Sequence, residues 1–189
     1  DEVYDKIVYG GDHVSFLGAG YDRVIMLNSF SKTFAMTGWR IGYVLSPNPK
    51  AMEQITKMQY YVTACSNDAM QYAVLSAMEK ASDYPDKMRE EFQTRRDLIC
   101  SRLNEMDGVS CHVPEGAFYV FPKIDANGLT SEEMAMEMLA EGVLCSPGSA
   151  FGEAGEGHLR FAYTISKHDI DRGMDRVAKV IDRITKKND

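Results

Sequence analysis

The sequence predicts an α/β chain with two parts, residues 1–75 and an α+β domain over residues 80–189. Three observations lead to this prediction. Short apolar runs of strand length are interspersed with longer segments whose apolar residues recur at helical spacing. Proline, glycine and asparagine mark the junctions between these segments. With 189 residues, 44% of them hydrophobic, the chain is also long enough to bury a core.

In the first part, two predicted strands are followed by two predicted helices. The apolar run 24–27 predicts a buried strand. Residues 39–45 predict a second strand, which ends at Ser-Pro-Asn-Pro because proline cannot donate a ladder hydrogen bond. Residues 50–61 have a helical composition. The second helix starts at Asn67 or Asp68, both good N-cap residues.

The second part alternates helices and short strands. Gly108 stops the first helix, and Thr130 or Ser131, followed by a glutamate, starts the second. Three helices are predicted, over residues 84–106, 130–141 and 167–184. Four strands are predicted, over residues 109–113, 117–121, 143–146 and 159–163, with Pro-Glu-Gly as a turn between the first two.

Composition argues against several classes of partner. The chain has 28 acidic and 21 basic side chains, a formal net charge of −7, which disfavours binding to nucleic acid or to an anionic membrane surface. The sequence has no long apolar span. Its histidines are not spaced as metal ligands, so we predict no metal site. The four cysteines are interpreted as reduced thiols of a cytoplasmic protein: Cys65, Cys100, Cys111 and Cys145.

The strongest functional signal is the segment from Ser29 to Arg40, with the sequence SFSKTFAMTGWR. It places Lys32 between two groups suited to binding a phosphate, the Ser29 hydroxyl and the Arg40 guanidinium. The preceding apolar run would deliver this segment to a site at the end of a strand. A desolvated lysine amine near another cation is a nucleophile that can form a Schiff base. The pattern therefore favours an aldehyde that carries a phosphate as the ligand.

Two other interpretations of Lys32 exist. A lysine on a loop after a strand is most often a solvated surface charge, which the flanking Ser29 and Arg40 argue against. Ser29 and Lys32 also satisfy the Ser-x-x-Lys pattern of serine β-lactamases and penicillin-binding proteins, in which Ser29 would be the nucleophile. That pattern needs a partner motif, Lys-Thr-Gly, which the sequence lacks.

In this segment and in others the chain resembles the fold-type I pyridoxal-phosphate (PLP) enzymes, and among them the class I/II, aspartate-aminotransferase-like aminotransferases. The matching motifs follow the family's order: residues 1–4, 29–43, 114–119, 143–152 and 159–162. The resemblance implies that the first part is the C-terminal portion of the large PLP-binding domain, with its α/β/α sheet. It implies that the second part is the small C-terminal α+β domain. It also implies a longer parent protein, because the strand expected before Asp1 is absent from the sequence.

The resemblance assigns roles to five residues of the first part. Lys32 would carry PLP as a Schiff base and then act as the catalytic base that moves the α-proton of the substrate. Arg40 and the Ser29 hydroxyl would hold the cofactor phosphate. Asp1 would pair with the pyridine nitrogen and keep it protonated, and the Tyr4 phenol would donate to the 3-oxygen. The protonated ring is the electron sink of PLP chemistry.

Arg160 stands alone among apolar residues in the predicted strand 159–163. Burying an unpaired guanidinium is costly, so this arginine needs an anionic partner. The partner is either an internal carboxylate in a salt bridge or the carboxylate of a ligand, which arginine binds with two parallel hydrogen bonds. The resemblance favours the second alternative, with Arg160 binding the α-carboxylate of an amino-acid substrate.

Together these residues favour an aminotransferase that moves an amino group between an L-amino acid and a 2-oxo acid, as a cytoplasmic homodimer when full length. Two alternatives stay open: a PLP-dependent carbon–sulfur lyase of the same fold, and the aminotransferase-like domain of a transcriptional regulator. The sequence does not name the amino acid. We expect the 189-residue chain by itself to be a poor catalyst, since the phosphate loop and the ring-stacking aromatic residue belong upstream of Asp1.

Overall fold

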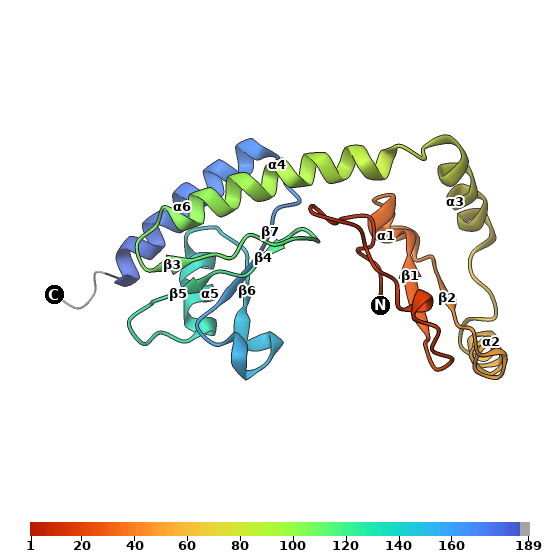
Figure 1. The fold of residues 1–189 in the computed structure, drawn as a ribbon. Coiled ribbons are helices and arrows are strands. Elements are labelled where there is room, and N and C mark those ends of the chain that lie inside the picture. Colours follow the sequence, from red (N-terminus) through yellow and green to blue (C-terminus); the bar gives the residue numbers. More distant parts are fainter. Residues whose placement is uncertain (186–189) are drawn as a thin grey trace. The chain divides into compact units, whose positions relative to one another are not determined.

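The computed structural model describes residues 1–185, and its elements are shown in Figure 1. Contacts within the chain divide it into two compact units, Asp1–Arg89 and Glu90–Asp189. None of the helices among the described residues has the length and the apolar composition needed to cross a membrane.

The first unit is built around a two-stranded antiparallel sheet. Strand β1 (Met26–Ser29) pairs with β2 (Gly42–Leu45), from Met26 opposite Leu45 to Ser29 opposite Gly42. The connection between the strands holds a single turn of helix, α1 (Phe30–Thr33), and a 3-10 turn, η2 (Thr37–Trp39). The sheet therefore brings the two ends of this connection back together, because Ser29 and Gly42 are partners in the ladder.

The first strand differs from its prediction in position and in burial. It begins at Met26, and only one of its faces is buried: Met26 and Asn28 are 7% and 8% exposed, whereas Ile25 and Leu27 are 47% and 48% exposed. Side chains alternate between the two faces of a strand, so a two-stranded sheet covered on one side leaves every second side chain uncovered. The prediction of a fully buried strand is wrong for this chain.

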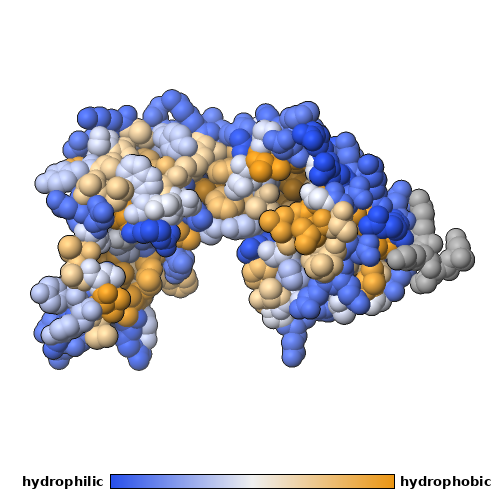
Figure 2. All heavy atoms as spheres, turned by 180° about the vertical axis from the view of Figure 1, so that it is seen from behind, coloured by the Kyte–Doolittle hydropathy of each residue, from blue (hydrophilic) through white to orange (hydrophobic). Residues whose placement is uncertain are grey.

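Two helices follow the sheet, α2 (Pro49–Thr63) and α3 (Asp68–Lys80). Each starts at an asparagine whose side-chain oxygen accepts a backbone hydrogen bond, Asn48 from Ala51 at 3.1 Å and Asn67 from Met70 at 3.3 Å. The predicted cap Asn67 is confirmed. Both helices expose large side chains, and apolar residues reach the surface in Figure 2. The most exposed tyrosines are Tyr60, Tyr61 and Tyr72.

The second unit combines three helices with short antiparallel strands. Its helices are α4 (Tyr84–Asn104), which begins in the first unit, α5 (Ser131–Ala140) and α6 (Lys167–Thr185). One sheet has the order β4-β7-β6, formed by Tyr119–Val120, Leu159–Ala162 and Ser146–Pro147, and β3 (Val109–Ser110) pairs with β5 (Lys123–Ile124). Two 3-10 turns belong to the second unit, η3 (Gly148–Phe151) and η4 (Glu153–Gly155), whereas η1 (Phe16–Ala19) lies in the first.

The strands predicted at 109–113 and 117–121 are present in shortened form, but they do not pair with each other. β3 pairs instead with β5, a strand that sequence analysis missed, and β4 pairs with β7. Two-residue strands have no alternation pattern to detect, and their partners are decided by the fold.

The core of the second unit lies along α6. Its inward stripe is at most 3% exposed and consists of Ile170, Met174, Val177, Val180, Ile181 and Ile184. These residues recur at three- and four-residue intervals, the spacing that places them on one face of a helix. Helix α5 begins with the predicted capping box, in which Glu133 N donates to the Thr130 hydroxyl at 3.2 Å and Thr130 N donates to the Glu133 carboxylate at 2.8 Å.

Candidate active site

A cavity of about 350 Å³ lies in the first unit where β1 ends and α1 begins. Four of the five residues predicted to bind the cofactor line it, namely Asp1, Ser29, Lys32 and Arg40. The other lining residues are Val3, Leu27, Asn28, Ser31 and Thr37. Residues that are distant in the sequence therefore share one cavity.

The turn from β1 into α1 positions Ser29 and Lys32. Ser29 is both the last residue of the strand and the N-cap of the helix, and its Oγ accepts a hydrogen bond from Ser31 N at 3.0 Å. The Ser29 hydroxyl also contacts the Ser31 Oγ at 2.7 Å and the Ile41 carbonyl at 3.2 Å. Lys32 follows within the single turn of α1, where it is half-buried. Strand, cap and lysine thus form one continuous local structure.

The close approach of β2 also depends on a glycine. A Cβ at Gly42 would lie 2.6 Å from the Asn28 carbonyl oxygen, so any side chain there would push β2 away from β1. Asn28 itself is 8% exposed, and its Oδ1 accepts a hydrogen bond from Ser29 N at 2.6 Å. Gly42 therefore lets the strand that follows Arg40 return beside Ser29.

Arg40 follows the turn η2 and adopts a left-handed backbone conformation, with φ of 54° and ψ of 52°. Its Nη1 donates to the Thr37 carbonyl at 2.9 Å. Among residues 1–185 no carboxylate forms an ion pair with it, so its charge is not neutralised there. A permanent cation that lines the same cavity as two serine hydroxyls is suited to binding an anion.

Asp1 reaches the cavity because the N-terminal segment is tied to β1. Glu2 N donates to the Leu27 carbonyl at 2.8 Å, and the Glu2 carboxylate holds the segment that follows by accepting from His13 at 3.0 Å and from Ser15 at 3.0 Å. The hydrogen bonds from His13 and Ser15 lower the pKa of Glu2 below its usual range, against a smaller opposing effect of burial. Glu2 is thus a structural anchor that sequence analysis did not identify.

Tyr4 is half-buried in the turn after Asp1, where its carbonyl accepts a hydrogen bond from Ile7 N at 2.9 Å. It is not among the residues that line the cavity. Conversely, Ser31, Asn28 and Thr37 line the cavity without having been predicted. For Ser31 a signal was available, because it is adjacent to Lys32 and lies two positions after Ser29.

Arg160 belongs to the second unit, on β7. Its guanidinium carbon lies 4.6 Å from the ring centroid of Tyr119 and 4.5 Å from that of Phe151, and its Nη2 donates to the Ser146 hydroxyl at 3.3 Å. Within the described part of the chain it makes no salt bridge, so the internal carboxylate considered above is not found there. Two aromatic faces and one hydroxyl hold the guanidinium, and they do not neutralise its charge.

The loop that carries Phe151 is closely packed. The backbones of Gly148 and Gly155 lie so near each other that a Cβ on either would overlap the carbonyl oxygen of the other. Gly148 N donates to the His158 carbonyl at 2.8 Å, which ties the loop to the start of β7. Phe151 is thereby held beside Arg160 by backbone contacts.

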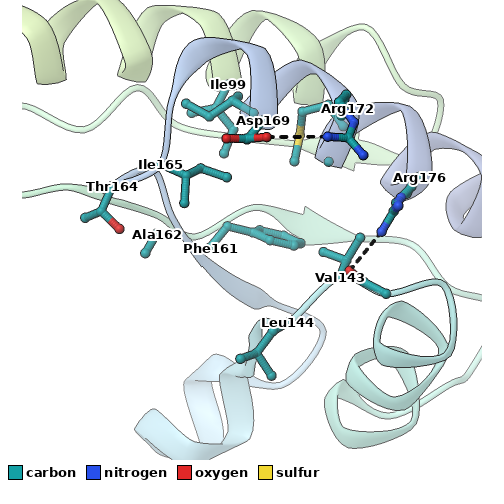
Figure 3. A pocket seen from close by; sticks show the side chains of 14 residues that line it. Ile99, Val143, Leu144, Phe161, Ala162, Thr164, Ile165, Asp169, Arg172 and Arg176 are labelled. Carbon is teal, nitrogen blue, oxygen red and sulfur yellow. Dashed lines mark hydrogen bonds and ion pairs between the residues drawn. The ribbon is translucent and has the colours of Figure 1, made fainter.

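A larger cavity of about 500 Å³ lies in the second unit beside α6 (Figure 3). Its lining is mainly apolar and contains no lysine. Its charged side chains have partners, since Arg172 forms an ion pair with Asp169 at 3.7 Å and Arg176 donates to the Gly142 carbonyl at 3.3 Å. This cavity does not have the groups that Schiff-base chemistry needs.

Comparison with known proteins identifies the family of this chain. The sequence model of the family described as aminotransferase class I and II matches residues 1–177, which is most of the chain. The chain belongs to this family. Membership of the class I and II aminotransferases confirms the resemblance inferred from the sequence, and it confirms the predicted fold class.

Several members of the family are similar to this chain. It is 41% identical to aromatic-amino-acid aminotransferase 2 of Thermococcus litoralis and 43% identical to an aspartate aminotransferase of Pyrococcus abyssi, in each case over 96% of this chain and 48% of the relative. The solved structure of an aromatic aminotransferase from Pyrococcus horikoshii OT3 matches with a TM-score of 0.89 and 40% identity, over 96% of this chain and 50% of that one. The chain spans about half the length of the curated aminotransferases it matches.

Proposed function

We propose that the protein to which this chain belongs is a PLP-dependent aminotransferase, which transfers an amino group between an L-amino acid and a 2-oxo acid. The observation that carries the proposal is the cavity at the end of β1, with Lys32, Ser29, Arg40 and Asp1 in its lining. An amine, a hydroxyl, a guanidinium and a carboxylate match the aldehyde, phosphate and ring nitrogen of PLP. Membership of a family whose curated relatives are named aminotransferases supports the same conclusion.

The groups around Arg40 fit a phosphate. Its guanidinium carries a charge that no carboxylate of residues 1–185 pairs with, and the Ser29 and Ser31 hydroxyls of the same cavity lie 2.7 Å from each other. Arg40 and Ser29 would hold the phosphate, and the Asp1 carboxylate would pair with the protonated ring nitrogen. Tyr4 would donate to the 3-oxygen of the cofactor, a role that is supported only by the resemblance to the family.

When bound, PLP supplies an electron sink that stabilises negative charge at the α-carbon of the substrate. Lys32 is the residue of this chain that would bond to the aldehyde through its Nζ. Once the substrate amine has displaced the lysine, its free amine would take the α-proton. Arg160 would hold the substrate α-carboxylate with its planar fork. Tyr119 and Phe151 would keep the plane of that fork in place.

The names of the relatives favour aspartate or an aromatic amino acid as the amino donor. We also propose a cytoplasmic homodimer as the form of the full-length protein. No observation on the described residues favours the carbon–sulfur lyase or the regulator over the aminotransferase, and the relatives' names speak for the latter.

The test uses the full-length parent protein, loaded with PLP, reduced with borohydride and digested for mass spectrometry. The pyridoxyl label is expected on Lys32, and the unreduced enzyme should transfer the amino group of aspartate or phenylalanine to 2-oxoglutarate. Lys50→Arg, which alters an exposed lysine of α2, is the matched control and should leave label and transfer unchanged. A label on a different lysine would refute the assignment. A label on Lys32 together with breakdown of cystathionine and no transfer would favour the lyase.

A further inference from the structure

Two of the four cysteines are buried together in the second unit. Cys100 is 2% exposed and lies on α4, whereas Cys111 is 6% exposed and directly follows β3. Both are free thiols. In Figure 1 the end of α4 leads through a short turn into β3, the strand that Cys111 follows.

Asn104 holds Cys111 against α4. Its Nδ2 donates to the Cys111 carbonyl at 2.9 Å, and its Oδ1 accepts from Cys111 N at 2.8 Å, so one side chain satisfies both backbone groups of the cysteine. Cys100 and Asn104 are four positions apart on α4 and therefore lie one above the other on the same face. The asparagine thus fixes the Cys111 backbone one helical turn from Cys100.

The two thiols influence each other's ionisation, and the Cys111 Sγ donates to the His112 carbonyl at 3.5 Å. The hydrogen bond to Cys111, together with burial, raises the pKa of Cys100, whereas the same hydrogen bond lowers the pKa of Cys111. Cys111 is therefore the thiol of the pair that ionises first and is the better nucleophile.

We propose that Cys100 and Cys111 are a redox-active pair that forms an intramolecular disulfide with a small peroxide as the oxidant. This inference does not depend on the proposed aminotransferase function. The structural observations behind it are the double hydrogen bond from Asn104, which fixes the Cys111 backbone one helical turn from Cys100, and the burial of both cysteines.

The reaction balances in two steps. The Cys111 thiolate attacks one oxygen of hydrogen peroxide, the O–O bond breaks, and the departing hydroxide takes up a proton to become water, which leaves Cys111 as a sulfenic acid. The Cys100 sulfur then attacks Cys111 Sγ, the S–O bond breaks, and the hydroxyl leaves with the Cys100 proton as a second water. The two sulfurs lose two electrons in total, which reduce the peroxide to two molecules of water.

Burial sets the rate of this reaction. Peroxide reaches the pair only when the segment after α4 opens, so oxidation should follow local opening rather than thiol acidity alone. The other cysteines provide the comparison: Cys65 is exposed, and Cys145 is half-buried with its pKa raised to about 11 by burial. Neither of them has a second cysteine in contact among the described residues. The disulfide would close a short loop at the end of α4 and should raise the melting temperature.

The experiment uses the 189-residue chain and a Cys65→Ser/Cys145→Ser variant, which keeps only the buried pair. After treatment with hydrogen peroxide, the variant should lose two hydrogens in mass, lose both thiols and yield a linked peptide containing Cys100 and Cys111. Dithiothreitol should reverse all three changes. The oxidised variant should also melt at a higher temperature than the reduced one.

Cys100→Ser in the same background is the matched control. Without the partner, Cys111 should stop at the sulfenic acid, which dimedone traps, and no loss of two hydrogens should occur. Native wild-type chain is oxidised in parallel, so that a folding defect in a variant does not decide the result. The proposal is overturned if both thiols of the pair survive peroxide in the wild type, or if the linked peptides contain Cys65 or Cys145.

Discussion

The two units of the chain differ in how they hold their residues. In Asp1–Arg89 the buried apolar residues are Ile7, Met26, Val74 and Pro85, whereas the second unit contains a continuous core that includes the whole inward stripe of α6. The first unit positions Ser29, Lys32 and its other cavity residues through a cap, tight turns and a two-stranded ladder. Local hydrogen bonds thus place the chemical groups, and burial supplies stability elsewhere in the chain.

This contrast leads to a general expectation. Substitutions of cavity residues in the first unit should change chemistry with little effect on stability, and substitutions in the core of the second unit should do the reverse. Arg160 is the exception to examine, because it lies in the second unit but has a proposed role in binding the substrate.

The largest effect is expected from Lys32→Ala in the full-length enzyme. Loss of both the covalent attachment and the catalytic base should lower kcat/KM by at least about 10⁴-fold. The melting temperature of the protein without PLP should stay unchanged, because the side chain is only half-buried on a one-turn helix. Steady-state kinetics and thermal melts measure the two quantities. A large fall in stability would contradict the contrast between the units.

Leu103→Ala tests the core of the second unit. Leu103 is fully buried on α4, so truncation should reduce the free energy of unfolding by about 2–5 kcal/mol through lost burial and a cavity. Leu144→Ala is the matched control, since this leucine is 85% exposed and its removal should cost less than about 0.5 kcal/mol. Urea unfolding of the 189-residue chain measures both. Equal effects would mean that the core does not lie where the structure has it.

Arg160→Lys should have an intermediate effect on catalysis. Lysine keeps the charge but loses the planar fork and its stacking between Tyr119 and Phe151, so kcat/KM should fall about 10- to 100-fold while PLP stays bound. Arg102→Lys is the control, because Arg102 pairs with Asp171 and Asp175 and has no proposed role in catalysis. Unchanged kinetics for Arg160→Lys would remove the residue from the substrate site.

The smallest expected effects are on stability at low pH. One carboxylate from each unit, Glu2 and Glu133, provides the comparison. Hydrogen bonds lower the pKa of Glu2, chiefly from His13, and that of Glu133, chiefly from the Thr130 backbone, below the usual 4.5. A carboxylate with a lowered folded-state pKa stabilises the fold above its unfolded pKa, and this contribution is lost as the pH falls through the folded value. Carboxyl chemical shifts against pH measure both values. Glu2→Gln and Glu133→Gln should each reduce the loss of folding stability as the pH falls. A measured pKa at or above 4.5 for Glu2 or Glu133 would contradict the hydrogen bonds.

Local sequence determined a large part of the fold. The stripe of α6, the Asn67 cap and the capping box of Thr130 and Glu133 were all predictable, because helical spacing and caps involve residues within about one turn of each other. The segment from Ser29 to Arg40 was predictable for the same reason. Its lysine, serine and arginine are close in the sequence, and a single strand, turn and strand brings them to one cavity.

Tertiary structure alone decided the rest. Four features depend on residues that no local sequence pattern connects. They are the pairing of β3 with β5, the half-exposed face of β1, the aromatic rings around Arg160 and the interaction of Cys100 with Cys111. Asp1 reaches the cavity only because Glu2 N bonds to the Leu27 carbonyl. Periodicity and capping depend on residues that are close in the sequence, whereas burial and long-range pairing depend on which surfaces the folded chain brings together.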